Sequence, residues 1–395
     1  MTDEKADLTS RPLAGIRVVD LSRLVAGNML SHLLADFGAD VIKIERPGTG
    51  DDLRNWREKG VEIFWKAYSR NKRSVCWNLR RDDDKAKLLQ LVKTAHVFIE
   101  NFVPGKLEEF GLGPDVLLEA NPKLVIVRVS GWGQTGPYRQ RPGFGTLIEG
   151  MSGYAHLNGF PDKPPALPPL ATADMISGLY GAYAVMLALR HVEMQGGAGQ
   201  VIDLSLFDSM FSFVASEAVK YRVSGQVSMR AGNQAPHTAP RNVYRCGDGR
   251  FIALSASMQG MYERLVRAMG RPDLIDDPHY RTNEDRVQHR DALDEIIEAF
   301  MMKRSLDENL QFFEAAGVTV GPVLAIDDLL KHPYMSGRHV VSEFSDPDVD
   351  TIPAQTPVPR LSRTPGQLKT PAPALGAHTQ EIEAELQQMK VDADE

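Results

Sequence analysis

Cysteine is scarce in this sequence, with Cys76 and Cys246 as the only two among 395 residues and no CxxC pair. Two separated thiols are too few for a disulfide framework or a thiolate metal site, so we expect no bound metal and a cytoplasmic location. Long apolar runs are scarce as well. Residues 1–12 contain no apolar segment, and the richest run, 179–189, is about half as long as a membrane span. We therefore expect neither export nor a membrane partner.

A strong excess of one charge is also missing. Lys and Arg number 45 against 52 Asp and Glu, which gives a net charge of −7. This balance offers no global attraction for nucleic acid, so any phosphate must be bound by local cations. The chain is 43% hydrophobic and 25% charged, as folded proteins are, and at about 150 residues per domain its length predicts two to three domains.

Several common catalytic motifs are absent. Ten histidines occur without an HExxH pattern, and no G-x-S-x-G motif is present. Zinc hydrolases and serine hydrolases of those types therefore lack their usual anchors. The first predicted strand is followed by residues 22–28, Ser-Arg-Leu-Val-Ala-Gly-Asn, instead of the G-x-G-x-x-G that admits a dinucleotide pyrophosphate. A nicotinamide or flavin cofactor is therefore disfavoured.

What is present is a repeated strand and helix pattern. Residues 15–46 read as a strand, an amphipathic helix that ends at Gly38, and a second strand. Further strands are predicted at Ser74–Leu79, His96–Glu100 and Leu124–Val129, with helices at Asp84–Thr94 and Pro114–Glu119 between them. Such alternation is typical of an α/β fold with a parallel sheet.

The composition then divides the chain into three parts. Residues 1–224 form the N-terminal part of a large domain, and residues 225–325 form a smaller α+β domain with a hairpin near 244–254. Residues 326–395 form a C-terminal segment. Its proline-rich stretch 346–373 cannot build a core, so we expect it to lie extended on another surface.

One carboxylate and one guanidinium stand out. Asp174 opens a helix, 175–190, that is otherwise apolar or small. Asp174 or Thr172 can serve as the N-cap, and the helix dipole also holds a carboxylate there in place and ionised. Arg46 follows the second strand, where a guanidinium can bind a phosphate or an adenine-bearing ligand, or form a surface ion pair.

Seven segments follow one another along nearly the whole chain: GIRVVDLS (15–22), FGADVIKIERPG (37–48), NKRS (71–74), IENFVPG (99–105), AD (173–174), GQVIDLSLFD (199–208) and LGAHT (375–379). In this order they resemble the class III coenzyme A transferases, the group of formyl-CoA transferase and carnitine-CoA transferase. The resemblance implies a Rossmann-like large domain built from both chain ends, a small domain between them, and a homodimer whose subunits interlock.

The resemblance also implies roles for individual residues. Asp174 occupies the position of the family's nucleophile. Coenzyme A is expected to be a substrate, with no permanently bound cofactor, and to be held by Val25, Ala26, Arg46, Leu79, Asn101 and Phe102. Glu109 stands where the family has a basic residue, and Lys106 is expected to replace that contact. Where the formyl-CoA branch has a mobile run of glycines, this chain has Ser255–Met261, so Gln259 and Gly260 are expected at the substrate in a stiffer lid.

The implied reaction moves coenzyme A from an acyl-CoA to a carboxylate. Asp174 would carry first an anhydride and then a CoA thioester, and no general base is needed because both nucleophiles are anions. Residues 141–153 resemble the branch that uses succinyl-CoA and short dicarboxylic acids. Arg23, after the first strand, is the candidate for a second carboxylate, with a structural ion pair as the alternative. The sequence leaves open the acceptor, the donor, and transfer within or between molecules.

Two other functions stay possible at this stage. Acyl-CoA racemases resemble this group, but they need a second base in the loop where this chain has Phe144 and Gly145, which cannot exchange a proton. His156 is the substitute to consider, with a structural role as its alternative. The other possibility is a protein that binds coenzyme A or a nucleotide without turnover.

Overall fold

The structure, a computed structural model, describes residues 11–394, which divide into two compact units. The first comprises residues up to Tyr154, Pro168–Ser216 and the chain from Ser336 onward. The second comprises Ala155–Leu167 and Glu217–Met335. These bounds are wider than the 225–325 expected for the small domain, and they assign 155–167, which the sequence placed in the large domain, to the second unit.

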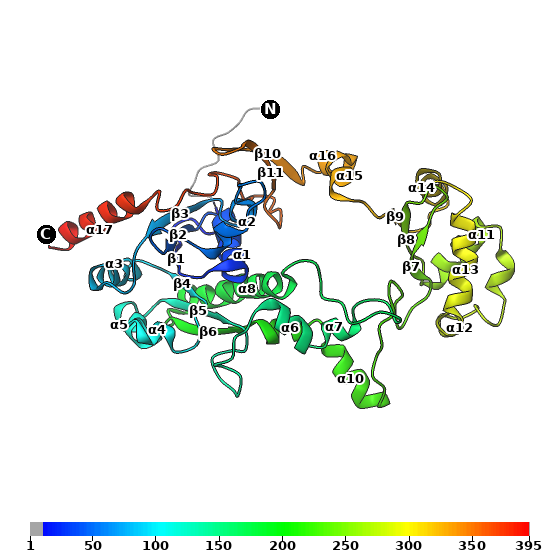
Figure 1. The fold of residues 1–395 in the computed structure, drawn as a ribbon, viewed down its shortest axis with the longest axis horizontal. Helices are drawn as coiled ribbons and strands as arrows, with labels where there is room; N and C mark the ends of the chain where they lie inside the picture. The colour runs from blue at the N-terminus through cyan, green and yellow to red at the C-terminus, as the bar shows by residue number, and fades with distance from the viewer. Residues whose placement is uncertain (1–10, 395) are drawn as a thin grey trace. The chain divides into compact units, whose positions relative to one another are not determined.

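The first unit contains a six-stranded sheet in the order β3-β2-β1-β4-β5-β6, with all neighbouring strands parallel (Figure 1). The strands are β1 (Arg17–Asp20), β2 (Asp40–Glu45), β3 (Lys72–Cys76), β4 (Val97–Glu100), β5 (Val125–Ser130) and β6 (Gln200–Ser205). The predicted α/β class and parallel sheet are confirmed. The strand order reverses at β1, because β2 and β3 are added on one side of it and β4, β5 and β6 on the other. In open parallel sheets, ligands bind beside the carboxyl ends of the strands at such a point.

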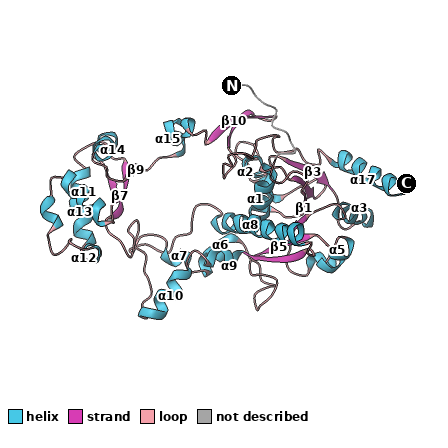
Figure 2. Cartoon of the chain, turned by 180° about the vertical axis from the view of Figure 1, so that it is seen from behind, coloured by secondary structure: helices cyan, strands magenta, loops and turns pink. Residues whose placement is uncertain are grey.

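Helices cover both faces of this sheet (Figure 2). One face packs on α1 (Leu24–Asp36), α6 (Gly145–Met151), α8 (Thr172–Gln195) and α9 (Leu206–Phe211). The other face packs on α3 (Asp82–Val92), α5 (Pro114–Ala120) and α17 (Thr379–Asp394). Successive strand residues alternate between the two cores. Val18, for example, packs in the first core and Val19 in the second. This alternation explains the apolar runs that the sequence shows in its strands.

The C-terminal segment is divided between the two units, because residues 326–335 belong to the second and the chain from Ser336 onward belongs to the first. The part in the first unit contains a hairpin of β10 (Val341–Asp346) and β11 (Asp350–Gln355), so the stretch predicted to be extended from residue 346 includes a strand that pairs with β10. Further along, the carbonyl oxygen of Gln367 accepts a hydrogen bond from Asn71, and Trp77 donates to Glu383 of α17. These contacts fasten the tail beside β3.

The second unit is a small α+β structure with its own core. Three antiparallel strands, β7 (Arg241–Arg245), β8 (Phe251–Ser255) and β9 (Val320–Pro322), include the predicted hairpin and one further strand. The main helices are α11 (Gln259–Ala268), α12 (Asn283–Gln288), α13 (Arg290–Met301) and α14 (Leu306–Ala315). Capping boxes at Thr282 and Ser305 begin α12 and α14.

Two glycines allow α8 to lie close against α1. A Cβ atom at Gly178 would fall 2.8 Å from Met29 Cβ and 3.1 Å from the carbonyl oxygen of Ala26. One at Gly181 would fall 2.3 Å from a methyl carbon of Leu30. All three distances are below van der Waals contact, so the close approach of these helices requires glycine at these positions.

We therefore expect Gly178→Ala to lower the free energy of unfolding by about 1–3 kcal/mol, because the new methyl group overpacks the α1–α8 contact. Gly150→Ala is the matched control, since no atom lies within 4 Å of the Cβ position on this exposed part of α6. The control should be neutral or stabilise by about 0.5–1 kcal/mol. Denaturant titration measures both, and equal midpoints for the two variants would contradict the tight contact.

Candidate active site

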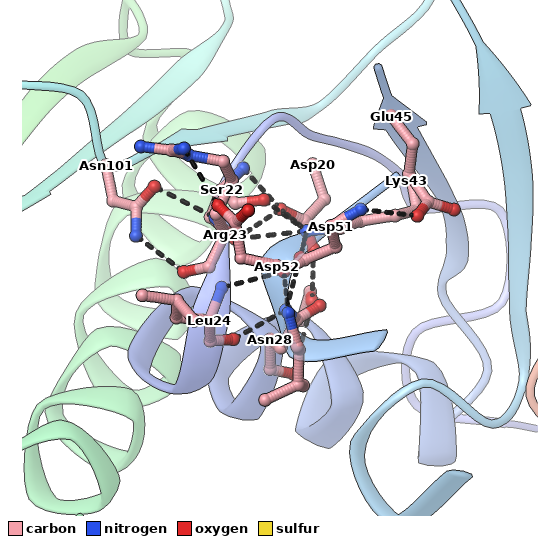
Figure 3. Close-up of polar contacts among 12 residues, drawn as sticks. Asp20, Ser22, Arg23, Leu24, Asn28, Lys43, Glu45, Asp51, Asp52 and Asn101 are labelled. Atoms are coloured by element: carbon pink, nitrogen blue, oxygen red, sulfur yellow. Dashed lines mark hydrogen bonds and ion pairs between the residues drawn. The ribbon is translucent and has the colours of Figure 1, made fainter. Parts of the chain in front are cut away.

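A buried group of charges lies where β1 and β2 end (Figure 3). The ammonium group of Lys43 lies 3.3 Å from Asp20 Oδ1 and 3.1 Å from Asp51 Oδ2, and all three side chains are almost completely buried. Burial alone would lower the pKa of Lys43, but the two carboxylates outweigh it and raise that pKa above its ordinary value. The Lys43 ammonium group thus connects Asp20, at the end of β1, with Asp51, in the loop after β2.

The same group shapes the turn between β1 and α1. Asp51 accepts hydrogen bonds from the backbone amide of Leu24 and from the side chain of Asn28. Asn101, which follows β4, accepts from the Arg23 amide and donates to the Arg23 carbonyl. Leu24 has a φ of 62°, a conformation that non-glycine residues rarely adopt. These bonds on both sides of Leu24 hold the turn in that conformation.

A cavity of about 650 Å³ opens at the carboxyl ends of β1, β2 and β3 and the loop after β4. Five of the predicted ligand-binding residues line it: Arg23, Arg46, Leu79, Phe102 and Lys106. The sequence analysis missed Trp77, Asn78, Arg80, Val103 and Phe110, which line it too. The predicted strand 74–79 ends at Cys76, and this earlier end turns residues 77–80 into a loop beside the cavity.

The cavity contains four cationic side chains. Asp52 bridges two of them, at 2.9 Å from Arg23 and 2.8 Å from Arg46, so the ion pairs considered for both residues are present. Lys106 pairs with Glu109, the residue that replaces the family's basic one. The fourth cation, Arg80, is exposed and forms no ion pair with any other residue of 11–394. The cavity therefore combines positive charge with apolar walls such as Trp77 and Phe102.

Three predicted ligand contacts lie elsewhere. Asn101 does not line the cavity, because both ends of its amide bond the backbone of Arg23. The Val25 side chain is 1% exposed and packs with Leu53 and Trp65. Ala26 is also buried, and its backbone amide forms a hydrogen bond with Asp174.

Asp174 is the third residue of α8 and is half-buried. The predicted N-cap role of Asp174 or Thr172 is wrong, because the N-cap is Ala171, without a side-chain hydrogen bond. The carboxylate lies directly against Gly145, where a Cβ atom would fall 2.3 Å from Asp174 Oδ2. Gly145 therefore leaves the space that the carboxylate occupies.

The pKa of Asp174 is raised to about 6. Burial is the main cause and the negative charge of Glu149 the second, while the backbone amides of Ala26 and Asp174 itself act in the opposite direction. The expectation that the helix terminus keeps this group ionised is thus only partly met, because burial outweighs it. At neutral pH the carboxylate is still mostly ionised and available as a nucleophile.

The expected lid residues are helical. Gln259 and Gly260 are the first two residues of α11. Gln259 Oε1 accepts a hydrogen bond from Arg286, a completely buried guanidinium that also donates to the carbonyl oxygen of Ser257. Two hydrogen bonds from Arg286 thus hold the segment that replaces the family's glycine run.

None of the three residues considered as the second base of a racemase is placed to act as one. Phe144 is the N-cap of α6, and the Asp174 carboxylate fills the space where Gly145 would carry a side chain. His156, the substitute, has its Nε2 atom 3.1 Å from the carbonyl oxygen of Ser228. Within the described residues, no group of three or more His, Cys, Asp and Glu side chains is arranged to hold a metal ion.

The sequence matches a known protein family over most of its length. The family model described as CoA-transferase family III matches residues 13–379. Succinyl-CoA–D-citramalate CoA-transferase of Chloroflexus aurantiacus is 38% identical over 379 residues, 95% of this chain and 94% of that protein. Succinate–glutarate CoA-transferase of Agrobacterium fabrum is 36% identical over 386 residues, 95% of this chain and 96% of that protein.

The fold is also similar to that of a solved protein structure. The crystal structure of a CAIB/BAIF family protein from Brucella suis superposes with a TM-score of 0.84 at 34% identity, covering 95% of this chain and 100% of that chain. The resemblance seen in the sequence motifs is thereby confirmed. The chain belongs to CoA-transferase family III and is a class III CoA-transferase.

Proposed function

We propose that this enzyme transfers coenzyme A from succinyl-CoA to a short dicarboxylic acid, with Asp174 as the covalent carrier. The observation that carries the proposal is the position of the Asp174 carboxylate. It is bonded to the amide of Ala26 in the first turn of α1, while residues 21–23 just before that turn line the cationic cavity. The Asp174 carboxylate and the cavity thus both lie at the N-terminal end of α1.

The chemistry needs only a positioned carboxylate. A carboxylate oxygen of Asp174 attacks the thioester carbonyl, and the carbon–sulfur bond breaks to release the CoA thiolate. The thiolate then attacks the Asp174 carbonyl, which forms an aspartyl-CoA thioester and frees the donor acid. The acceptor carboxylate repeats these two steps in reverse order, so the thioester bond is conserved and Asp174 is regenerated.

The cavity has the features that coenzyme A requires. Its apolar walls at Ile44, Leu79 and Phe102 suit an adenine ring, and its cations suit phosphates. The acids named in relatives of this chain, citramalate and glutarate, are dicarboxylic, and the first is named with succinyl-CoA. Arg23 is the residue we assign to the second carboxylate, because it lines the cavity and immediately precedes α1.

We also propose that the enzyme is a homodimer that packs through α8. This helix is long and apolar enough to span a membrane, yet only 39% of its most apolar window is buried within the unit. Leu179, Tyr183 and Leu187 form an exposed stripe at four-residue spacing, each more than half exposed. A second copy of the chain would cover the stripe, and the family resemblance supports subunits that interlock.

Replacing the nucleophile tests the proposed reaction. Asp174→Asn keeps the shape of the side chain but lacks the anionic oxygen, so transfer from succinyl-CoA to citramalate, malate or glutarate should fall at least about a thousandfold. Asp208→Asn, at an exposed position of α9, should keep the parent rate. Parent activity in Asp174→Asn would refute the covalent role.

Coenzyme A binding should depend on the unpaired cation of the cavity. We expect Arg80→Met to weaken CoA binding about three- to tenfold, and the difference should shrink at high salt because the contact is exposed. Arg81→Met is the matched control, since Arg81 pairs with Asp83 outside the cavity. Titration calorimetry measures both, and equal losses would show that the cavity is not the phosphate site.

The oligomeric state can be measured directly. Sedimentation equilibrium of the full chain should give twice the monomer mass, and Tyr183→Glu should lower it by placing a charge in the covered stripe. Glu193→Gln, on the same helix, should leave the mass unchanged. A parent protein that sediments as a monomer would rule out the dimer.

A further inference from the structure

A second carboxylate lies beside Asp174. Glu149 belongs to α6 and is only 3% exposed, although its side chain is acidic. It follows Gly145 by four residues, so the two lie on the same face of the helix, the face that meets α8. Gly145 makes room for the Asp174 carboxylate, and Glu149 reaches the same helix end one turn later.

The hydrogen bond of Glu149 is made to the residue before the nucleophile. Its Oε1 atom accepts from the backbone amide of Ala173, at 3.1 Å. Ala173 is the second residue of α8, whose N-cap Ala171 offers no side-chain acceptor. Glu149 therefore supplies from another helix the acceptor that the α8 terminus lacks.

A neutral side chain could supply that acceptor equally well. Glutamine has the same length and a carbonyl oxygen, and burying it costs far less than burying a carboxylate. The charge of Glu149 is therefore not needed for capping. What the charge does is repel the ionised carboxylate of Asp174.

We propose that Glu149 is a positioning residue for Asp174 whose negative charge destabilises the free aspartate and thereby favours its acylation. The inference rests on the proposed function. Before the reaction the side chains of Glu149 and Asp174 meet at the N-terminal turn of α8. When Asp174 becomes an anhydride or a thioester it is neutral, and its negative charge leaves on the CoA thiolate or on the released acid. The repulsion is then relieved, so the covalent state gains stability relative to the free enzyme.

The other charged groups around Asp174 do not offset this repulsion. From α1 the contribution is the neutral amide of Ala26, while His32 and Asp36 of α1 lie within pairing distance of each other, and Asp36 also pairs with Arg70. The acidic residue of α9, Asp208, is exposed. Glu149 is the one charged side chain that shifts the pKa of Asp174 within residues 11–394, and it raises it.

The test compares the acid limb of kcat/KM in three proteins: the parent, Glu149→Gln and Glu119→Gln. Glu119 lies exposed on α5, so this control removes the same charge far from the repulsion. The phosphates of CoA titrate equally in all three, and only differences between the profiles count. Activity requires ionised Asp174, so in the parent it should be full well above pH 6 and half-maximal near pH 6 as the pH falls.

In Glu149→Gln the midpoint should move to lower pH by about one unit, while Glu119→Gln should keep the parent profile. One pH unit of repulsion corresponds to a tenfold effect on a step that neutralises Asp174, so the ratio of aspartyl-CoA thioester to free enzyme at pH 7.5 should fall about tenfold. A residue that only caps α8 would change neither quantity, because glutamine keeps the acceptor.

The possible outcomes distinguish a failure of the Glu149 role from a failure of the proposed transfer reaction. A parent enzyme that forms no adduct on Asp174 would refute the proposed function. A parent enzyme that forms the adduct, together with superposable profiles for both glutamine variants, would refute the role of Glu149 alone. Should Glu149→Gln not fold, the parent profile still decides, because a midpoint near the ordinary aspartate value of about 4 would exclude any repulsion.

Discussion

The close packing of α8 against α1 is the constraint on which the site depends. Asp174 is carried by the first turn of α8, and the amide that bonds it is carried by the first turn of α1. Gly178 and Gly181 permit the short distance between these helices, and Gly145 leaves space for the carboxylate itself. Larger residues at these three positions would separate Asp174, the proposed nucleophile, from the residues that line the cavity.

A buried group of charged side chains lies at the start of α1, and a pair of acidic side chains lies at the start of α8. Lys43 lies between Asp20 and Asp51, so opposite charges compensate one another and fix the start of α1. At the start of α8, the repulsion that we propose between Glu149 and Asp174 would end when Asp174 is acylated. The first arrangement is structural, whereas the second, in our proposal, raises the free energy of the residue that forms the covalent bond.

Much of the architecture could be predicted from the sequence, because strand and helix periodicities report burial directly. The parallel sheet, the small α+β unit and Asp174 as the candidate nucleophile all came from local patterns and ordered motifs. The N-cap was wrong because Glu149 supplies the acceptor from a different helix. Arg80 was missed because the strand before it ends at Cys76, three residues earlier than predicted. Neither the hydrogen bond from a different helix nor the early end of the strand leaves a local signal in the sequence.

The most direct measurement is the mass of the enzyme after mixing with succinyl-CoA, followed by peptide mapping. The account predicts that the protein gains the mass of coenzyme A less one water, located on the peptide that contains Asp174. Full transfer activity without any adduct on that peptide, or with the adduct on another residue, would contradict it.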